Sequence, residues 1–275
     1  MTQTLDGVPF RLGEPFDMSF MGRYGTVFSV FDDQDSGNIC FGVKNDHGRY
    51  FVKYAGAPTL RAACSPETAV QNLRAALPAY RDLSHESLIR LVHDEPVGGG
   101  HAALFEWSDG VCMGRMYPNA RKQFVEMPIN TRVRVFSEIL RFHAHVHEKG
   151  YVAVDFYDGS ILYDFEEKKT MLCDYVKKPF HNEMGRLWGS SLFMSPEEFL
   201  LGAEIDEVTN VYTMGATAFA LFANFQRARE AWPLSDALFR VIEKAVSDDR
   251  ALRQPSILHL MAEWQTALGD TFVMQ

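Results

Sequence analysis

The spacing of apolar residues changes once along this sequence, and that change constrains the fold more than any single motif does. Up to about residue 107, aromatic and β-branched runs alternate with clusters of Asp, Asn, Ser and Gly, which favour tight turns between antiparallel strands. From residue 131 the spacing becomes helical, beginning with a run that ends at Gly150. We therefore expect an α+β protein whose first part is rich in sheet and whose second part is mostly helical.

The first part contains five expected strands and one expected helix, and two short pieces interrupt the helices of the second part. The strands are predicted over residues 27–31, 38–44, 49–55, 87–95 and 101–107, and the hairpin-like interruptions over residues 151–165 and 168–176. A helix is expected after Ser65, which can cap it, with Pro66 at its first position. Pro78 is the position at which this helix is expected to kink or stop.

The composition predicts a large core and excludes two classes of protein. A chain of 275 residues that is 47% hydrophobic can bury roughly three quarters of its unfolded surface. Its 27 basic and 36 acidic residues give a net charge of −9, so nucleic-acid binding is not expected. No run approaches the ~18 apolar residues of a membrane span, and no signal-peptide pattern opens the sequence. We expect a cytoplasmic protein with no membrane association.

The cysteines and a group of histidines are expected to be packing residues. The four cysteines lie singly, at positions 40, 64, 112 and 173. This scatter fits neither a disulfide framework nor a zinc site. His143 and His147 are one helical turn apart, with His145 between them, but the HExxH pattern of a zinc helix is absent. These histidines are therefore predicted to be packed or capping groups rather than metal ligands.

Two aspartates follow short apolar runs in the most informative part of the sequence. Asp155 ends one run, Ser160 comes five positions later, and Asp174 ends a second run. In phosphoryl transfer, one carboxylate orients the attacking hydroxyl and another holds Mg²⁺ against the nucleotide phosphates. The pattern therefore favours that chemistry.

In their order along the chain, these and other strings resemble the eukaryotic-like protein kinase family over almost the whole sequence. The catalytic loop H-R-D-L-x-x-x-N and the metal motif D-F-G of that family correspond to A-V-D-F-Y-D-G-S (153–160) and D-Y-V (174–176). Later matches are GSSLFMSPEE (189–198) at the end of the activation segment, EVTNVYTMGATAFALF (207–222) for the next helix, and DDRALRQPS (248–256) for the late arginine motif. In the helix, Asn210 stands where the family usually has Asp.

The resemblance implies a two-lobed protein-kinase-like fold, with an antiparallel sheet lobe over residues 1–107 and a helical lobe over residues 108–275. Asp155 would be the catalytic carboxylate, and Asp174 and Ser160 would hold the metal. The late arginine motif implies a pairing of Arg253 with Glu197 that closes the activation segment.

The match is looser in the sheet lobe, where the resemblance still implies roles for several residues. Lys53, in the string RYFVKYA, would contact the α- and β-phosphates, and Glu67 in the following helix would pair with it. The string FEW (105–107) would be the hinge, where Glu106 and Trp107 meet the adenine edge with backbone groups.

Two frames remain open for the loop over the phosphates. In the first, F-M-G-R-Y-G-T-V (20–27) supplies the glycines and Lys44 is the lysine. In the second, D-S-G-N (35–38) covers the phosphates with Ser36, Gly37 and Asn38, and Lys53 is the lysine. The second frame resembles the loop of small-molecule kinases related to aminoglycoside phosphotransferases. We prefer it because the turn N-D-H-G joins two strands of matching length around Lys53.

Departures from the family pattern leave three functions open. Ala153 and Val154 replace the His-Arg pair, Ser160 replaces an asparagine, and Tyr157 replaces a lysine, while Asp158 has no family role. The expected activity is transfer from ATP, with Mg²⁺ or Mn²⁺, to a Ser or Thr hydroxyl of a protein, without any need for phosphorylation of the activation segment. The alternatives are a pseudokinase that binds a nucleotide or a partner, and a kinase for a small-molecule acceptor.

Overall fold

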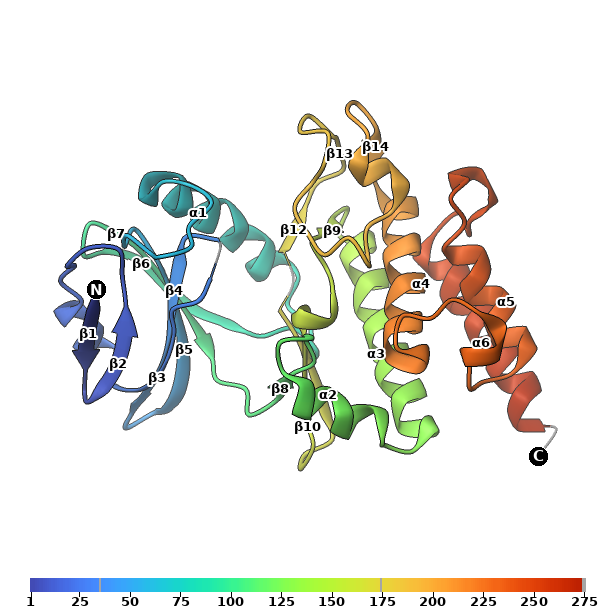
Figure 1. Ribbon diagram of the computed structural model, residues 1–275, viewed down its shortest axis with the longest axis horizontal. Helices are drawn as coiled ribbons and strands as arrows, with labels where there is room; N and C mark the ends of the chain where they lie inside the picture. Colours follow the sequence, from blue (N-terminus) through green and yellow to red (C-terminus); the bar gives the residue numbers. More distant parts are fainter. Residues whose placement is uncertain (35, 174, 274–275) are drawn as a thin grey trace. The chain divides into compact units, whose positions relative to one another are not determined.

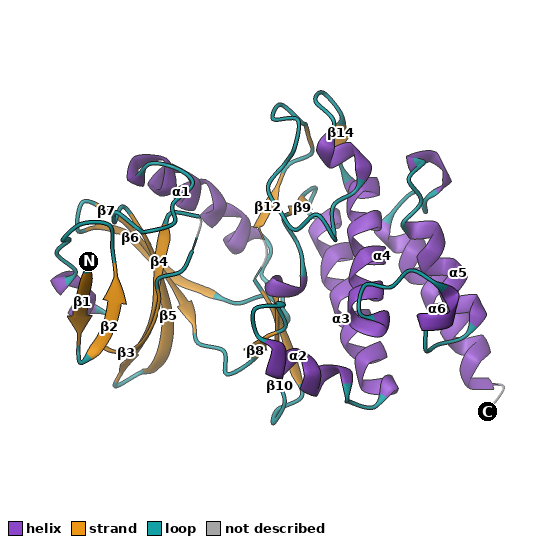
Figure 2. Ribbon diagram, in the orientation of Figure 1, coloured by secondary structure: helices purple, strands orange, loops and turns teal. Residues whose placement is uncertain are grey.

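The computed structural model describes residues 1–34, 36–173 and 175–273 (Figure 1). The chain divides into two compact units: unit 1 contains residues 1–84 and 89–108, and unit 2 contains residues 85–88 and the chain from residue 109 onward. The described residues form six α-helices and several antiparallel sheets (Figure 2). The predicted α+β class is therefore confirmed.

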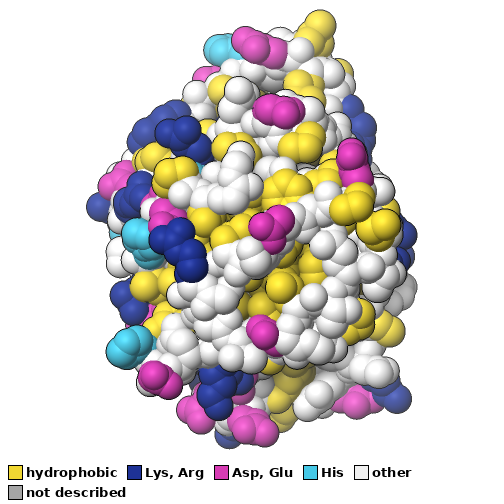
Figure 3. Space-filling view, turned by 90° about the vertical axis from the view of Figure 1, so that its left-hand side faces the viewer, with side chains coloured by type: hydrophobic (Ala, Val, Ile, Leu, Met, Phe, Trp, Pro, Cys, Tyr) yellow, Lys and Arg dark blue, Asp and Glu magenta, His cyan; other side chains and the backbone are white. Residues whose placement is uncertain are grey.

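Unit 1 is a five-stranded antiparallel sheet with a hairpin on one face and a helix on the other. Its elements are β1 (Thr2–Leu5), β2 (Val8–Arg11), a 3-10 helix (Ser19–Arg23), β3 (Thr26–Phe31), β4 (Asn38–Asn45), β5 (Gly48–Ala55), α1 (Pro66–Asp82), β6 (Leu91–Val97) and β7 (Gly100–Glu106). The sheet order is β3-β4-β5-β7-β6, and β1 pairs with β2 in a separate hairpin. Apolar side chains gather among polar ones on the face of unit 1 that Figure 3 turns to the viewer.

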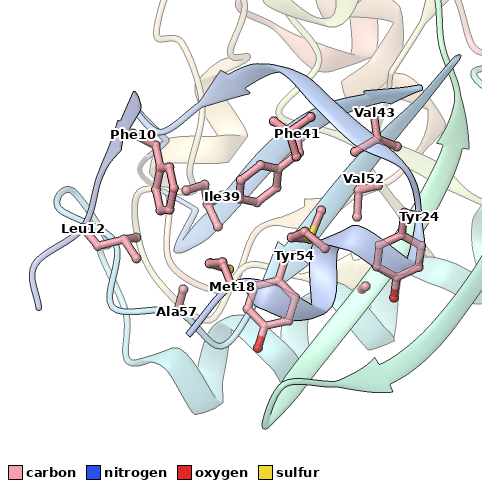
Figure 4. Close-up of a cluster of buried hydrophobic side chains, with 13 residues drawn as sticks. Phe10, Leu12, Met18, Tyr24, Ile39, Phe41, Val43, Val52, Tyr54 and Ala57 are labelled. Carbon is pink, nitrogen blue, oxygen red and sulfur yellow. The ribbon is translucent and has the colours of Figure 1, made fainter. Parts of the chain in front are cut away.

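The two faces of this sheet bury different cores, because successive side chains of a strand point in opposite directions. Under the hairpin lie large apolar side chains that include Phe10, Phe41 and Tyr54 (Figure 4). On the other face, Ala55 packs with Leu73 of α1. The alternation along β5 therefore leaves Lys53, which lies between Val52 and Tyr54 in sequence, on the helix-covered face.

The β1–β2 hairpin lies outside the strands predicted from the sequence. Asp6 and Gly7 form its turn, with positive φ at both positions, and such an Asp-Gly pair is a hairpin signal. The Asp6 carboxylate accepts a hydrogen bond from the backbone N–H of Val27 at 2.7 Å. Arg11 donates from its backbone and its guanidinium to Asp32, directly after β3. The hairpin is thereby fixed to β3 at both ends.

Most predicted strands of unit 1 are within two residues of the observed ones, but the strand predicted over 87–95 is wrong in its first half. β6 begins only at Leu91, and residues 85–88 belong to unit 2. There, the Ser87 carbonyl accepts a hydrogen bond from the Leu172 N–H at 2.6 Å. Pro78 also does not end α1, which continues to Asp82.

Unit 2 is mostly helical, with short strands that pair across the chain. Its elements are β8 (Val111–Cys112), α2 (Pro118–Val125), α3 (Ile129–Glu148), β9 (Val152–Val154), β10 (Ile161–Asp164), β11 (Lys169–Leu172), β12 (Tyr175–Lys177), β13 (Phe180–His181), β14 (Glu204–Ile205), α4 (Glu207–Ala223), α5 (Asp236–Ala245) and α6 (Ile257–Val273). 3-10 helices lie at Asp158–Ser160, Pro196–Phe199, Arg229–Ala231 and Arg250–Leu252.

The strands of the two pieces expected to be hairpin-like pair between the pieces rather than within them. β10 pairs with β11, and β9 pairs with β12, all antiparallel. Because the piece 151–165 contributes one strand to each pair, the loop between β9 and β10 is held at both ends.

Helix α4 lies at the centre of unit 2. Its residues from Thr209 to Ala223 are all buried, as expected for a helix that is apolar on every side. Aromatic rings connect the neighbouring helices: Phe136 of α3 packs against Trp264 of α6, with ring centroids 4.9 Å apart. Within the described ranges, no helix combines the length and the hydropathy that crossing a bilayer requires.

Candidate functional site

Asp155 directly follows the buried strand β9 and is itself exposed. Its φ is +65°, in the left-handed region. Aspartate tolerates this region better than most residues, yet the conformation still costs free energy and is concentrated at functional sites. The sharp turn after β9 therefore presents the Asp155 side chain at the surface of unit 2.

The strand that directly precedes Asp155 is held by the side chain of Asn210, which is buried in α4. The Asn210 Oδ1 accepts a hydrogen bond from the Ala153 N–H at 2.7 Å, and its Nδ2 donates to the Ala153 carbonyl at 2.8 Å. A carboxamide can do both, whereas an ionised aspartate can only accept. The asparagine that departs from the family pattern thus fits this backbone better than aspartate would.

Ser160 lies at the end of the 3-10 helix that follows Asp155, and it is buried. Its carbonyl accepts a hydrogen bond from the Cys173 N–H at 3.0 Å. Asp174, the other predicted metal ligand, lies outside the described residues. Over the described part of the chain, no three His, Cys, Asp or Glu side chains are grouped as a metal site.

Asp158, to which the sequence assigned no role, forms a buried ion pair in the same loop. Its Oδ2 is 2.7 Å from the Arg121 Nη1 of α2, and Arg121 also donates to the Ala220 carbonyl and to the Asn224 Oδ1. Burial raises the pKa of Asp158, and the charge of Arg121 opposes that shift. The pair fastens the loop after Asp155 to the end of α4.

The segment that contains Gly189 lies directly beside the Asp155 carboxylate. A Cβ atom built at Gly189 would be 3.0 Å from the Asp155 Oδ1, and the φ of Gly189 is +134°. Close approach and a conformation that favours glycine both explain this residue. The sequence alone indicated neither, because a single glycine carries no spatial information.

The pairing of Glu197 with Arg253 is confirmed. The Arg253 Nη1 and Nη2 donate to the two Glu197 carboxylate oxygens at 2.6 and 2.9 Å, and both residues are buried. Burial acts to raise the pKa of Glu197, but the hydrogen bonds from Arg253 leave it below the ordinary value. This two-point ion pair anchors the end of the segment 189–198 to unit 2.

In unit 1, the structure does not join Lys53 to Glu67. Lys53 is half-buried on β5, opposite Cys40 of β4 and Ala103 of β7. Glu67 is exposed on the first turn of α1, whose buried side chains are apolar and include Leu73. No ion pair connects the two among the described residues, so their pairing stays a prediction.

The two frames for the phosphate loop occupy different places in unit 1. Residues 32–37 join the adjacent strands β3 and β4, and the Ser36 Oγ accepts a hydrogen bond from the Asn38 Nδ2 at 2.9 Å. Gly37 has a φ of +76°, and a Cβ there would be 2.9 Å from that of Ala69 in α1. The frame 20–27 instead spans the 3-10 helix and the start of β3. Residues 36–38 of the second frame thus lie where the chain enters β4, beside its sheet neighbour β3.

The turn 32–37 carries carboxylates that pair with arginines from other segments. Asp32 accepts hydrogen bonds from Arg11, which hold the pKa of its carboxyl below the ordinary value. Asp33 lies 2.9 Å from the Nε of Arg61, and Asp35 lies outside the described residues. These arginines offset the negative charge of Asp32 and Asp33.

The predicted hinge residues lie at and just beyond the end of β7. The Glu106 N–H donates to the Arg90 carbonyl at 3.0 Å, and the Trp107 N–H donates to the Arg49 carbonyl at 3.3 Å. The Trp107 ring packs edge-on against Phe28, with centroids 4.8 Å apart. The backbone N–H groups of both residues are therefore used within unit 1, and their contact with an adenine stays a prediction.

The histidines of α3 make the packing contacts that the sequence favours. The His143 Nδ1 lies 2.9 Å from the Ile139 carbonyl, and the His143 ring packs against Phe156 with centroids 4.4 Å apart. The His147 Nε2 lies 2.5 Å from a carboxylate oxygen of Glu207. His145 instead packs against His85, with ring centroids 5.3 Å apart.

Comparison with known proteins shows a distant relationship to kinases. No family model matches this chain. Dual specificity protein kinase zak2 of Dictyostelium discoideum is 24% identical over 144 residues, which cover 45% of this chain and 22% of that protein. Dual specificity protein kinase zakA of the same organism is 24% identical over 136 residues, which cover 45% of this chain and 17% of that protein. The matches thus span about a fifth of each relative and indicate a kinase-like relationship.

Proposed function

We propose that this chain is a phosphotransferase with a protein-kinase-like fold that transfers the γ-phosphoryl group of ATP to a Ser or Thr hydroxyl. The observation that carries the proposal is the fixed, exposed position of Asp155, which follows a strand held by Asn210 and lies beside Gly189. A carboxylate so presented can accept a hydrogen bond from an acceptor hydroxyl and orient it for attack. The similarity to two protein kinases supports the same chemistry.

The other roles follow from residue chemistry. Asp174 and Ser160 offer the carboxylate and hydroxyl oxygens that Mg²⁺ or Mn²⁺ prefers. When bound, the metal would offset the charge of the nucleotide phosphates. In unit 1, Lys53 and the backbone of the turn 35–38 would bind the phosphates, and Glu106 and Trp107 would meet the adenine.

The acceptor is proposed to be a protein rather than a small molecule. The segment 189–198 ends in the buried pair of Glu197 and Arg253, and in the family that it resembles this segment is the platform for peptide substrates. A rigid platform beside Asp155 suits a bulky acceptor. The turn 35–38 is the feature that would favour a small-molecule acceptor.

A pseudokinase is the second candidate, and the place of Glu67 favours it. Glu67 is exposed, and the buried face of α1 offers Lys53 no carboxylate. The acidic turn 32–37 would also oppose a polyphosphate wherever its arginine partners are displaced. Such a protein would bind a partner through surfaces that do not depend on ATP turnover.

The deciding experiment measures ATP turnover with Mg²⁺ or Mn²⁺ by wild-type protein and by Asp155→Asn. ADP release and the intact masses of the protein and of a generic protein substrate are followed together. A loss of about a hundredfold or more in Asp155→Asn would support the kinase. The matched control is Asp248→Asn, which removes an exposed carboxylate elsewhere in unit 2 and is expected to leave turnover unchanged.

Nucleotide binding separates the two candidates if turnover is absent. At a Mg·ATP concentration about a hundred times its Kd, a single site would stabilise the fold by about 2.7 kcal/mol, which raises the melting temperature. Stabilisation without turnover would indicate a nucleotide-binding pseudokinase. The absence of both stabilisation and turnover would contradict the proposed phosphotransferase.

A further inference from the structure

The segment between β13 and β14, residues 182–203, contains the glycine that lies beside Asp155. Its two ends are joined because Phe180 pairs with Ile205 and His181 pairs with Glu204. The middle of the segment has no regular strand or helix before the 3-10 helix at Pro196–Phe199. Its shape therefore depends on side-chain contacts and on backbone hydrogen bonds outside regular strands and helices.

Asn182 supplies several of these contacts, and its side chain is fully buried. Its Nδ2 donates to the Gly185 carbonyl at 2.6 Å, and the Glu198 and Glu197 carbonyls lie at 3.3 and 3.5 Å from the same nitrogen. Its Oδ1 accepts a hydrogen bond from the Met184 N–H at 3.0 Å. Both polar atoms of the carboxamide are thus bonded to backbone.

The backbone of Asn182 adds two more hydrogen bonds within the same segment. Its N–H donates to the Ala203 carbonyl at 2.8 Å, and its carbonyl accepts from the Gly202 N–H at 2.6 Å. The Leu187 N–H donates to the Glu198 carbonyl at 2.9 Å, two residues before Gly189. One residue therefore links the start, the 3-10 helix and the end of the segment.

The contacts of Asn182 reach the best-anchored point of unit 2. The Glu197 whose carbonyl faces the Asn182 amide is the residue that pairs with Arg253 through both carboxylate oxygens. The contacts of the buried Arg253 therefore reach Asn182 through Glu197, and the bond from Leu187 to the Glu198 carbonyl continues them to two residues before Gly189. A shift of the Asn182 amide would be transmitted to the backbone beside Asp155.

We propose that Asn182 is a positioning residue that holds the segment 182–203 in a substrate-receiving shape without any phosphate group. The proposal rests on the proposed function and names how that site is regulated. The sequence has Val154 where the related family has the arginine that binds a phosphorylated segment. Arg186, within the segment, directs its guanidinium to the Leu187 and Gly189 carbonyls instead. The contacts that order the segment thus come from its own residues.

The first test is amide hydrogen exchange of the full chain in wild-type protein, Asn182→Ala and Asn182→Asp. Both variants lose the donor that faces three carbonyls, so the amides of Met184, Leu187 and Gly202 should exchange roughly ten to a hundred times faster at pH 8. The control is Thr217→Val, which removes a buried hydroxyl of α4 that donates to the Thr213 carbonyl.

A pH series sharpens this test, because the two variants differ in one respect. The carboxyl group introduced by Asn182→Asp regains a donor when it is protonated and has none when it is ionised. After correction for intrinsic exchange rates, the protection of the segment in Asn182→Asp should recover as the pH falls, while that of Asn182→Ala should stay low. The proposal would be overturned if exchange in the segment were unchanged in both variants or if protection recovered at low pH in both. It would also be overturned if Thr217→Val accelerated exchange at the same amides.

Kinetics separates this proposal from the proposed function. In Asn182→Ala, the KM for a protein acceptor should rise about tenfold or more while the KM for ATP stays the same. Equal rises in both constants would contradict a positioning role. If the wild type transfers no phosphate, the proposed function fails, while the exchange measurements still decide whether Asn182 orders the segment beside Asp155.

Discussion

The Asn210 side chain binds both backbone polar groups of Ala153, two residues before Asp155, with hydrogen bonds of 2.7 and 2.8 Å. Asn210 lies in the buried helix α4, so its own position is set by packing. The backbone of Ala153 cannot move along its strand without losing one of these bonds. A residue of the buried helix α4 thus fixes the backbone that leads to the candidate catalytic residue Asp155.

Replacing Asn210 by alanine should therefore destabilise unit 2 strongly. The change leaves a buried N–H and a buried carbonyl without partners, which costs about 2 to 5 kcal/mol in the free energy of unfolding. Urea denaturation of the full chain measures this loss. A change below about 0.5 kcal/mol would mean that water or a neighbouring group takes over both bonds of Ala153.

Much of the fold could be predicted from the sequence because its elements carry local signals. Turns rich in Asp, Asn, Ser and Gly marked the ends of the strands β3, β4 and β5, and Ser65 with Pro66 marked the start of α1. The failure at residues 87–95 has a physical cause. The apolar residues Leu88 and Leu91 look alike in sequence, but Leu88 bridges to Leu172 in unit 2 while β6 begins at Leu91.

A contact of the candidate site could be predicted from the sequence only where both partners stand in recognisable motifs. An arginine and a glutamate in matching motifs predicted the pair of Glu197 with Arg253, and the structure confirms it. Asp158 and Asn182 carry no such signal, because neither stands in a motif that implies a partner: Asp158 pairs with Arg121, and the Asn182 side chain bonds to backbone groups. Spacing along the chain does not report contacts of that kind.

Glu198 should make the protein less stable as the pH rises. Burial raises the pKa of its carboxyl to about 7 in the folded protein, although the Ser195 N–H and Oγ donate to it at 2.7 and 3.0 Å. A raised folded pKa gives stability that is complete below the unfolded pKa of about 4.3 and is lost as the pH rises through about 7.

The variant Glu198→Gln tests this, since its amide oxygen can still accept from Ser195 but carries no charge. We expect it to be more stable than the wild type at pH 8, by about 1 to 3 kcal/mol, and nearly equal at pH 4.5. Thermal unfolding across this pH range is the measurement. Lower stability than wild type at pH 8 would show that the charge of Glu198 strengthens its bonds more than burial weakens them.

His85 should make the protein less stable as the pH falls. Burial lowers its pKa, and the nearby His145 adds to that shift, with Arg141 acting in the same direction and Glu86 against it. The His85 Nδ1 also accepts a hydrogen bond from the Ser87 N–H at 3.1 Å, which a proton on that nitrogen would abolish.

The sign follows from the lowered pKa. The unfolded chain takes up a proton near pH 6.5 while the folded chain resists it, so stability falls from about pH 6.5 downward. His85→Gln should flatten this dependence between pH 7.5 and 5.5 in equilibrium unfolding. An equally steep loss in the variant would mean that His85 is not the group whose protonation destabilises the fold.

The variant Gly189→Ala should reduce phosphoryl transfer by more than its loss of stability explains. In Gly189→Ala the added methyl group would approach the Asp155 Oδ1 at 3.0 Å and would sit on a backbone with a φ of +134°. We expect the carboxylate to be displaced and phosphoryl transfer to fall by about a hundredfold, because reacting groups tolerate little misplacement.

The matched control for this change is Gly185→Ala in the same segment. Gly185 also has a positive φ, of +80°, but a Cβ there would meet nothing within 4 Å. Both variants should lose about 1 kcal/mol or more of stability from backbone strain, and only Gly189→Ala should lose turnover beyond that. Equal losses of turnover in the two variants would mean that the order of the segment, and not the space beside Asp155, limits the reaction.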